Sequence, residues 1–343
     1  MANYRGDGDR NGGKLVGMKG LELAERYYHV YGKRMIKEKF PRLEGRVAAG
    51  LVGQGSECLG FDDGISADHD YGPSFCLWLT RGDYETYGGT MMEEYRKLPK
   101  DFEGARGRQE SLHGGGRVGV LCIQDFYYGL LGTEDVPKDN KAWMRIPETS
   151  LCTATNGKVF EDPLGEFSRI RNGLLNFYPE DVRIKKIVAR AAAMAQSGQY
   201  NYARAMKRGE NVAAKLALAE FTKNAISMVY LLNRQYTPFY KWMHRGMKAL
   251  PVLSEVGDIL NLLALMEEQS AAWEGAGETD YLYTLNGNDK CVLIIEAVCN
   301  LVLQELTAQG LTQGEDNFLE SHTITMMGKI KDPYIRTLQI MEG

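Results

Sequence analysis

Apolar residues near the start of the chain recur at helical spacing. Between residues 18 and 40 they fall three and four positions apart, which places them on one face of a helix. Pro41 follows this segment and ends the helix, because proline has no backbone N–H to donate. The apolar positions of the expected helix are Leu21, Ala24, Tyr28, Tyr31 and Met35. The pattern therefore predicts an amphipathic helix that packs one face against the rest of the protein.

Short apolar runs without helical spacing follow and predict β-strands. They cover residues 46–53, 69–80 and 117–123. The first run has almost no polar interruption, which is typical of a strand covered on both faces. Helices are expected after the second and third strands, at residues 84–97 and 124–132. Together these elements predict a small unit of helices around a mixed sheet.

Beyond Gly132 the pattern changes to long helical segments. These segments span residues 180–196, 200–208, 210–232, 239–248, 255–268 and 290–309. We therefore expect the α+β class, with a small mixed sheet followed by an all-helical C-terminal domain. The expected division is a mobile polar tail at 1–14, an α/β domain at 15–132 and a helical domain at 133–343.

Composition narrows the class of protein. The chain has 343 residues, of which 44% are hydrophobic and 25% charged, so we expect a globular protein with a large core. Its net charge of −4 supplies no general attraction for nucleic acid, although a local basic patch at 105–108 stays open. The six cysteines form no CxxC pair, the N-terminus lacks the apolar run of a signal peptide, and the apolar segments at 259–266 and 292–303 are short. A cytoplasmic protein without a membrane partner is expected.

The most informative stretch joins the first two expected strands. It carries Gly55 and Ser56, a spacer of eleven residues, and then Asp68 and Asp70. Alternate residues of a strand share a face, so the two carboxylates would lie side by side and repel each other unless a cation binds between them. Oxygen ligands of this kind favour Mg²⁺ that also holds substrate phosphates. Gly55 lets the backbone approach a phosphate, and Ser56 offers a hydroxyl and N–H groups.

This arrangement resembles the signature of the polymerase-β-like nucleotidyltransferase superfamily. The chain also resembles, at residues 55–80, 198–210 and 231–251, an uncharacterised bacterial family of nucleotidyltransferase-like proteins with a helical C-terminal half. The resemblance implies transfer of a nucleotidyl group from a nucleoside triphosphate, with ATP the expected one. Asp68 and Asp70 would then hold Mg²⁺. The expected acceptor is a hydroxyl of a small molecule, as in the antibiotic-modifying nucleotidyltransferases, which the layout resembles.

One feature departs from the superfamily pattern. Its members carry a third carboxylate on a later strand, whereas the matching strand at 117–123 has no acidic residue and has Gly119 at the equivalent position. We assign the third catalytic carboxylate to Asp125. Other candidates for this role are Glu57, Glu110 and His113.

The helical half contributes a further set of candidates. Arg234, Tyr240 and Lys241 lie in one polar and aromatic segment, and Pro238 presets the start of a helix there. The resemblance to antibiotic nucleotidyltransferases, which close their site with a helical domain, implies that these residues contact the nucleotide in a cleft between the domains. In the alternative interpretation the aromatic residues belong to the core and the cations form a solvated face.

Several readings of the whole chain stay open. The Asp-rich stretch is also compatible with a solvated turn, whereas the spacing and terminal Glu of an EF-hand are missing. The leading function is a Mg²⁺-dependent nucleotidyltransferase. The alternatives are a nucleotide-binding sensor or interaction protein without catalysis, and a transferase whose acceptor is tRNA or a protein.

Overall fold

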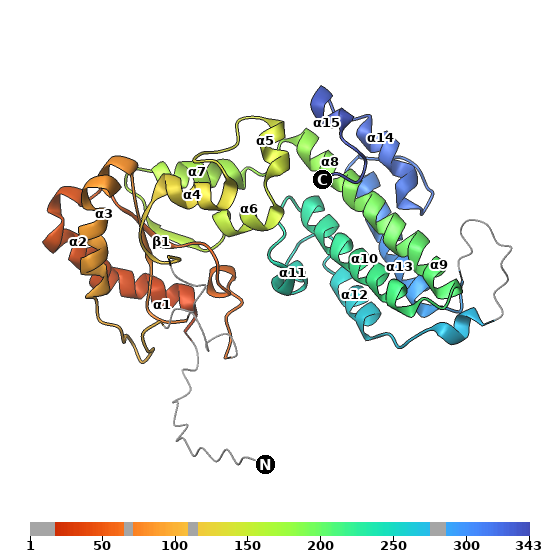
Figure 1. Ribbon diagram of the computed structural model, residues 1–343, viewed down its shortest axis with the longest axis horizontal. Coiled ribbons are helices and arrows are strands. Elements are labelled where there is room, and N and C mark those ends of the chain that lie inside the picture. Colours follow the sequence, from red (N-terminus) through yellow and green to blue (C-terminus); the bar gives the residue numbers. More distant parts are fainter. Residues whose placement is uncertain (1–17, 65–70, 109–115, 275–285) are drawn as a thin grey trace, which may run out of the picture. The chain divides into compact units, whose positions relative to one another are not determined.

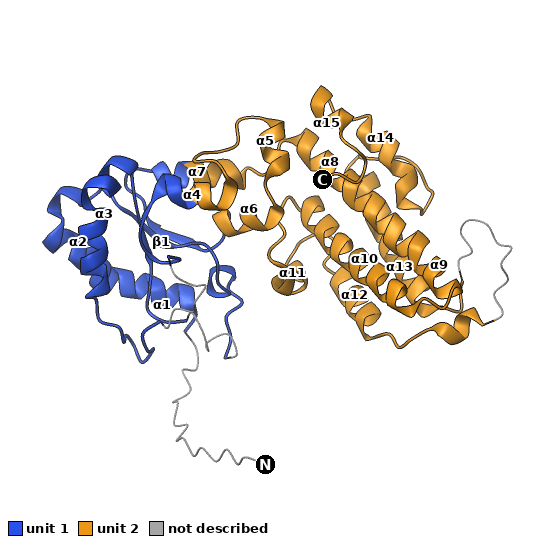
Figure 2. Ribbon diagram, in the orientation of Figure 1, with its two compact units in different colours: residues 1–126, 156–169 blue, residues 127–155, 170–343 orange. Residues whose placement is uncertain are grey.

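The computed structural model describes residues 18–64, 71–108, 116–274 and 286–343 (Figure 1). The predicted tail at 1–14 lies outside these residues, as do four candidate site residues: Asp68, Asp70, Glu110 and His113. The chain forms two compact units (Figure 2). Unit 1 comprises Met1–Phe126 and Asn156–Arg169, and unit 2 comprises Tyr127–Thr155 and Ile170–Gly343.

Unit 1 is built on a four-stranded sheet in the order β3-β2-β1-β4. The strands are β1 (Ala48–Leu51), β2 (Cys76–Leu79), β3 (Gly119–Cys122) and β4 (Lys158–Glu161). β1 pairs antiparallel with β2 and with β4, and β2 pairs parallel with β3, so the sheet is mixed. The side chains of β1 and β2 are buried throughout, as their continuous apolar sequence predicted.

Helices cover this sheet where the spacing of apolar residues predicted them. The first helix runs as α1 (Gly20–Tyr27), a π-helical turn at Tyr28–Gly32 and α2 (Lys33–Lys39). Its apolar residues join the core of the sheet, and the Tyr28 ring lies 5.4 Å from that of Phe75. α3 (Arg81–Arg96) follows β2, and the Thr80 hydroxyl accepts a hydrogen bond from the backbone of its first turn. α4 (Ile123–Leu131) follows β3.

The edge strand β4 is a strand of unit 1 that the sequence did not predict. Its four residues have intermediate or exposed side chains, including Lys158 and Glu161 at its ends. Such a short and partly polar run has no alternation long enough to distinguish a strand from a loop. Unit 1 therefore takes in residues 156–169, which the predicted boundary after residue 132 left in the helical part.

The described part of unit 2 consists of helices, with no strand. They are α5 (Asn140–Arg145), α6 (Glu148–Thr155), α8 (Glu180–Met194), α9 (Ala203–Lys207), α10 (Asn211–Leu232), α11 (Tyr240–Met247), α12 (Val256–Leu265), α13 (Lys290–Ala308), α14 (Thr323–Met327) and α15 (Pro333–Thr337), and α7 (Glu166–Leu175) begins in unit 1 and ends in unit 2. α8 and α10 form the centre of this unit (Figure 1). The expected class, α+β with a small mixed sheet followed by a helical region, is confirmed.

Among the described residues, α13 is the helix whose length and apolar composition would allow it to cross a membrane. It has 19 residues and is longer than the apolar run at 292–303 from which the sequence predicted no membrane span. One face of the helix, including Val298, Cys299 and Val302, is fully buried within unit 2. The core helix of a globular protein has the same properties, so α13 gives only weak evidence for a membrane.

Candidate functional site

The turn after β1 has a backbone that only glycine adopts readily. Gly53 and Gly55 have φ angles of +132° and +140°. A Cβ atom on Gly55 would lie 2.5 Å from both carboxylate oxygens of Glu57. Ser56 directly precedes a 3₁₀ turn at Glu57–Leu59, and its carbonyl accepts hydrogen bonds from Leu59 and Phe61. The Gly55–Ser56 pair found in the sequence therefore forms a tight turn at the end of β1.

Residue Asn156, just before β4, holds this turn in place. Its side-chain amide donates to the carbonyl of Gly53 at 2.7 Å and accepts from the N–H of Gly53 at 2.9 Å. The next residue, Gly157, donates its N–H to the carbonyl of Cys58 at 2.8 Å. These bonds satisfy backbone groups that the irregular turn cannot pair within itself. The turn is thus fixed by a segment about a hundred residues later in the chain.

A buried ion pair lies beside the turn. The Nη1 atom of Arg108 is 3.5 Å from Oε1 of Glu57, and the two side chains are only 6% and 10% exposed. Nη1 also donates to the hydroxyl of Ser74 at 3.2 Å. The Nε and Nη2 atoms of Arg108 are buried and have no hydrogen-bond partner. Most buried donors in proteins are paired, so this guanidinium is an unusual group.

The segments on either side of residues 65–70 come close to the same turn. Before this gap, the carboxylate of Asp62 accepts a hydrogen bond from the N–H of Gly20 at 2.9 Å. After it, the ring of Tyr71 lies 3.5 Å from the place where a Cβ on Gly20 would be. Burial raises the pKa of Tyr71, and the neighbouring charges of Asp62 and Glu57 raise it further. Asp62 and Tyr71 thus both lie near Glu57.

The two predicted metal ligands, Asp68 and Asp70, lie outside the described residues. Within the described ranges, no group of three or more His, Cys, Asp or Glu side chains could hold a metal ion. Asp62 has one buried oxygen, Oδ1, without a hydrogen-bond partner, 3.7 Å from the ammonium of Lys19. The metal site of the sequence analysis stays a prediction.

Asp125, assigned above as the third catalytic carboxylate, lies away from the Gly55 turn, and its role stays a prediction. Asp125 follows β3 in the first turn of α4, is 58% exposed and pairs with Arg81 at 2.7 Å. β3 runs parallel to β2, and both run antiparallel to β1. The C-terminal end of β3 therefore lies at the opposite end of the sheet from the C-terminal end of β1, where the Gly55 turn follows. The structure therefore separates Asp125 from the turn that the nucleotide was expected to occupy.

No acidic side chain could simply replace Gly119 on β3. Gly119 has a φ angle of +105°, and a Cβ atom there would lie 2.7 Å from the methyl carbon of Met92. A larger residue would need both a strained backbone and a displacement of the Met92 side chain. Of the other candidates for the third carboxylate, Glu57 is the one that the structure describes beside the turn.

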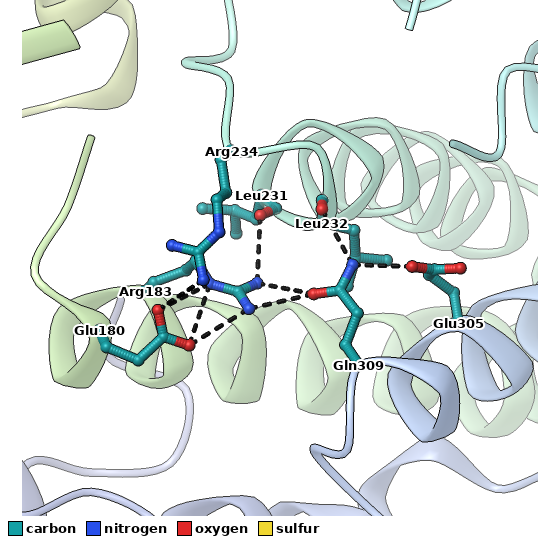
Figure 3. Close-up of polar contacts among 7 residues, drawn as sticks. All are labelled: Glu180, Arg183, Leu231, Leu232, Arg234, Glu305 and Gln309. Atoms are coloured by element: carbon teal, nitrogen blue, oxygen red, sulfur yellow. Dashed lines mark hydrogen bonds and ion pairs between the residues drawn. The ribbon is translucent and has the colours of Figure 1, made fainter. Parts of the chain in front are cut away.

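Arg234, a predicted nucleotide contact, belongs to a polar network within unit 2 (Figure 3). It lies just after α10, and its guanidinium pairs with Glu180 at 2.9 Å. Glu180 also pairs with the buried Arg183, which donates to Gln309 at 3.0 Å, and Gln309 in turn donates to the carbonyl of Leu232. The network satisfies carbonyls at the end of α10, so the charge of Arg234 has a structural partner.

Tyr240 and Lys241 begin helix α11 in unit 2. Tyr240 is 71% exposed, and its ring centroid is 4.6 Å from that of Phe239. The Lys241 ammonium lies over the Trp242 ring, 5.2 Å from its centroid. An exposed aromatic pair beside a cation is compatible with a nucleotide contact and equally with a solvated helix face. Their role stays a prediction.

Sequence reasoning missed two residues of the site. It treated Arg108 as part of a basic stretch at 105–108, and it gave no role to Asn156. The Asn156-Gly157 pair is a turn signal that indicates an irregular backbone, but not which segment it contacts. The burial of Arg108 follows from tertiary packing. A Cβ atom on Gly72 would lie 2.6 Å from the backbone nitrogen of Arg108, so the glycine at position 72 allows this close approach.

The comparisons with known proteins add limited information. A family model described as "Domain of unknown function (DUF4037)" matches residues 143–243. Among solved structures, the chain is similar to a nucleotidyltransferase-like protein from Exiguobacterium sibiricum, with 11% identity over 89% of this chain and 91% of that chain. The TM-score is 0.35, which is too low to support a conclusion about fold or function. No curated protein matches the chain.

Proposed function

We propose that unit 1 binds a nucleoside triphosphate at the Gly55–Ser56 turn and transfers its nucleotidyl group to a hydroxyl of a small molecule. In this proposal Asp68 and Asp70 hold Mg²⁺, which would supply positive charge to the reacting phosphates. The expected triphosphate is ATP. The acceptor oxygen forms a bond to the α-phosphorus, the bond from this phosphorus to the bridging oxygen breaks, pyrophosphate leaves, and the hydroxyl proton is released.

The observation that supports the proposal is the position of the described residues on either side of residues 65–70. Asp62 on one side and Tyr71 on the other both lie near Gly20 and Glu57, beside the turn that contains Gly55. In the proposal, Asp68 and Asp70 lie between these two residues in the sequence and bring their carboxylates to the glycine turn. The described residues also fit a phosphate, because the turn has no side chain at Gly53 or Gly55 and the nearby Arg108 has two nitrogens without hydrogen-bond partners.

One observation favours the alternative of nucleotide binding without catalysis. The described residues of β3 contain no acidic side chain, and Asp125 lies at the other end of the sheet. Without a third carboxylate, no described group is assigned to accept the proton of the attacking hydroxyl, apart from Glu57, which is paired with Arg108. A protein that only senses a nucleotide would need the turn but not this base.

Metal-dependent binding and turnover test the proposal. We expect labelled triphosphates to bind more tightly in the presence of Mg²⁺. With a panel of hydroxyl-bearing small molecules present, we expect release of pyrophosphate and transfer of the label. The double variant Asp68→Asn and Asp70→Asn should lose both properties. Asp63→Asn, an exposed carboxylate of the same loop that the motif does not use, is the matched control.

The outcomes separate the two candidate functions. Transfer that depends on Asp68 and Asp70 supports the transferase, whereas metal-dependent binding without pyrophosphate release supports the sensor. Triphosphate affinity that neither Mg²⁺ nor the double variant changes would contradict both.

A further inference from the structure

The guanidinium of Arg108 has an unusual distribution of contacts. Its polar contacts to described residues involve one nitrogen, Nη1, which lies near Glu57 and Ser74. The other two nitrogens, Nε and Nη2, are buried without a partner. An arginine stays charged at any pH that a protein experiences, so it cannot avoid the cost of these unpaired donors by losing a proton.

The two unpaired nitrogens form one side of the guanidinium. Nε–H and the adjacent N–H of Nη2 point in the same direction and make the fork that binds two oxygens of one phosphate or carboxylate. The free part of Arg108 is therefore a complete anion-binding edge. Because this edge is shielded from water, a charged hydrogen bond formed there is stronger than one on the surface.

The surroundings hold this edge in a fixed position. Glu57 lies on the Nη1 side, and its carboxylate packs against Gly55. The backbone of Arg108 packs against Gly72, which has a φ angle of +147° and leaves no room for a side chain. Arg108 is thus fixed from its backbone to its guanidinium, so little side-chain entropy remains to be lost on binding a ligand.

We propose that the Nε and Nη2 edge of Arg108 binds one phosphate group of the nucleotide and does so without a metal. This inference rests on the proposed function, since the ligand is a phosphate at the Gly55–Ser56 turn. Glu57 lies on the Nη1 side of the guanidinium, away from this edge, and its negative charge opposes the incoming phosphate. Phosphate suits the site because a tetrahedral group offers two oxygens to the fork.

Binding of inorganic tripolyphosphate in the presence of EDTA tests the proposal by calorimetry. The variant Arg108→Gln should bind roughly 10- to 100-fold more weakly than the unchanged protein, the range expected for a charge-assisted pair of hydrogen bonds. Arg108→Lys keeps the charge but loses the fork, and it should also bind more weakly. Arg106→Gln changes an exposed arginine two positions earlier and should have no effect.

A variant that is expected to raise the affinity shows that a weaker affinity in Arg108→Gln is not caused by loss of folding. Glu57→Gln removes the competing charge and keeps the shape of the side chain, so it should bind tripolyphosphate several-fold more tightly. Unchanged affinity in Arg108→Gln, or weaker binding in a folded Glu57→Gln variant, would overturn the proposal. Absence of tripolyphosphate binding by the unchanged protein would also overturn it, and Arg108 would then be a structural residue.

The same measurement distinguishes this inference from the proposed function. The variant with Asp68→Asn and Asp70→Asn should keep its metal-free affinity for tripolyphosphate, even though it loses metal-dependent transfer. Comparison of tripolyphosphate with ATP shows whether the nucleoside adds affinity or the site accepts free polyphosphate equally well. Binding that depends on Arg108 in a protein without transferase activity would support this inference and contradict the transferase.

Discussion

A single carboxylate, Glu148, organises the polar interior of unit 2. It accepts hydrogen bonds from Arg190 at 2.9 Å, from Ser227 at 3.0 Å and from Thr237 at 2.7 Å, and it is only 9% exposed. Burial alone would raise its pKa, but the charges of Arg190 and Lys186 and the two hydroxyl groups outweigh burial and lower it. Glu148 is therefore ionised in the folded protein and pairs buried cations.

Replacement of Glu148 by Gln should destabilise unit 2 by about 3 kcal/mol, because it leaves Arg190 and Lys186 without a counter-charge. Asp258→Asn is the control, since Asp258 is 84% exposed and pairs with Lys248 at 3.7 Å, so its loss should matter little. Denaturant unfolding measures both. A stability of Glu148→Gln equal to that of the control would contradict the assignment.

The same residue predicts how stability depends on pH. Because folding lowers the pKa of Glu148 below its ordinary value of 4.5, its contribution is fully present above that value. It is lost as the pH falls through the lowered pKa, where the folded protein also takes up the proton. Part of the acid-induced loss of stability should therefore disappear in Glu148→Gln.

At this scale the sequence predicted local structure that depends on near neighbours, such as the turn at Gly55 and Ser56. Gly55 and Ser56 could be recognised because the turn that they form follows a strand directly. The roles of Arg108 and Asp125 could not be deduced, since they depend on which end of the sheet each residue reaches. That in turn depends on the parallel pairing of β2 with β3, which a single sequence does not specify.

At the scale of elements, α3 provides a test of local packing with two adjacent glycines. Gly89 is exposed, and a Cβ there would meet nothing within 4 Å, whereas a Cβ on Gly88 would lie 2.8 Å from the ring of Tyr84. Gly89→Ala should stabilise the protein by roughly 0.5–1 kcal/mol, because alanine loses less backbone entropy in a helix. Gly88→Ala should gain less or destabilise. Thermal unfolding of the two variants measures the difference. Equal melting temperatures would contradict the expected effect of the Tyr84 ring on Gly88→Ala.

Helix α11 provides the second test at this scale. Its Lys241 was predicted to contact the triphosphate, and the structure describes it over the ring of Trp242. Lys241→Met should weaken triphosphate binding by about 1.5–3 kcal/mol, the scale of a hydrogen bond to a charged group. Calorimetry with Mg²⁺ and ATP measures this change. Unaltered affinity would identify Lys241 as part of a solvated helix face.

Elements were predicted well where the periodicity was long. The first helix, the strands β1, β2 and β3 and the helices from α8 to α13 lie where the pattern of apolar residues predicted them. The π-helical turn at Tyr28–Gly32 was not predicted, because one additional residue per turn barely disturbs the spacing of apolar positions. The strand β4 was not predicted, because its identity depends on the neighbouring strand β1 rather than on its own sequence.

At the scale of the whole molecule, the division into units does not follow the chain. The change from strands to helices near Gly132 suggested one boundary, yet unit 1 resumes at residues 156–169. The pattern of apolar residues shows where strands give way to helices, but not whether a later segment packs back into the first unit. The α+β class was predictable for the same reason that the exact division was not, because class depends on the kinds of elements and division on their contacts.

Unit 1 is built from two segments that are separate in the sequence, Met1–Phe126 and Asn156–Arg169. A fragment of residues 1–132 would lack β4, so β1 would become an open edge with buried, apolar side chains at Ala48–Leu51. Open apolar edges recruit further strands, so this fragment should self-associate, and the Gly53 turn should lose its bonds to Asn156. A synthetic peptide of residues 156–169 should restore a monomer, as the missing half of a split protein does. Light scattering with and without the peptide measures this, and a fragment that is monomeric by itself would show that the sheet can close without its last strand.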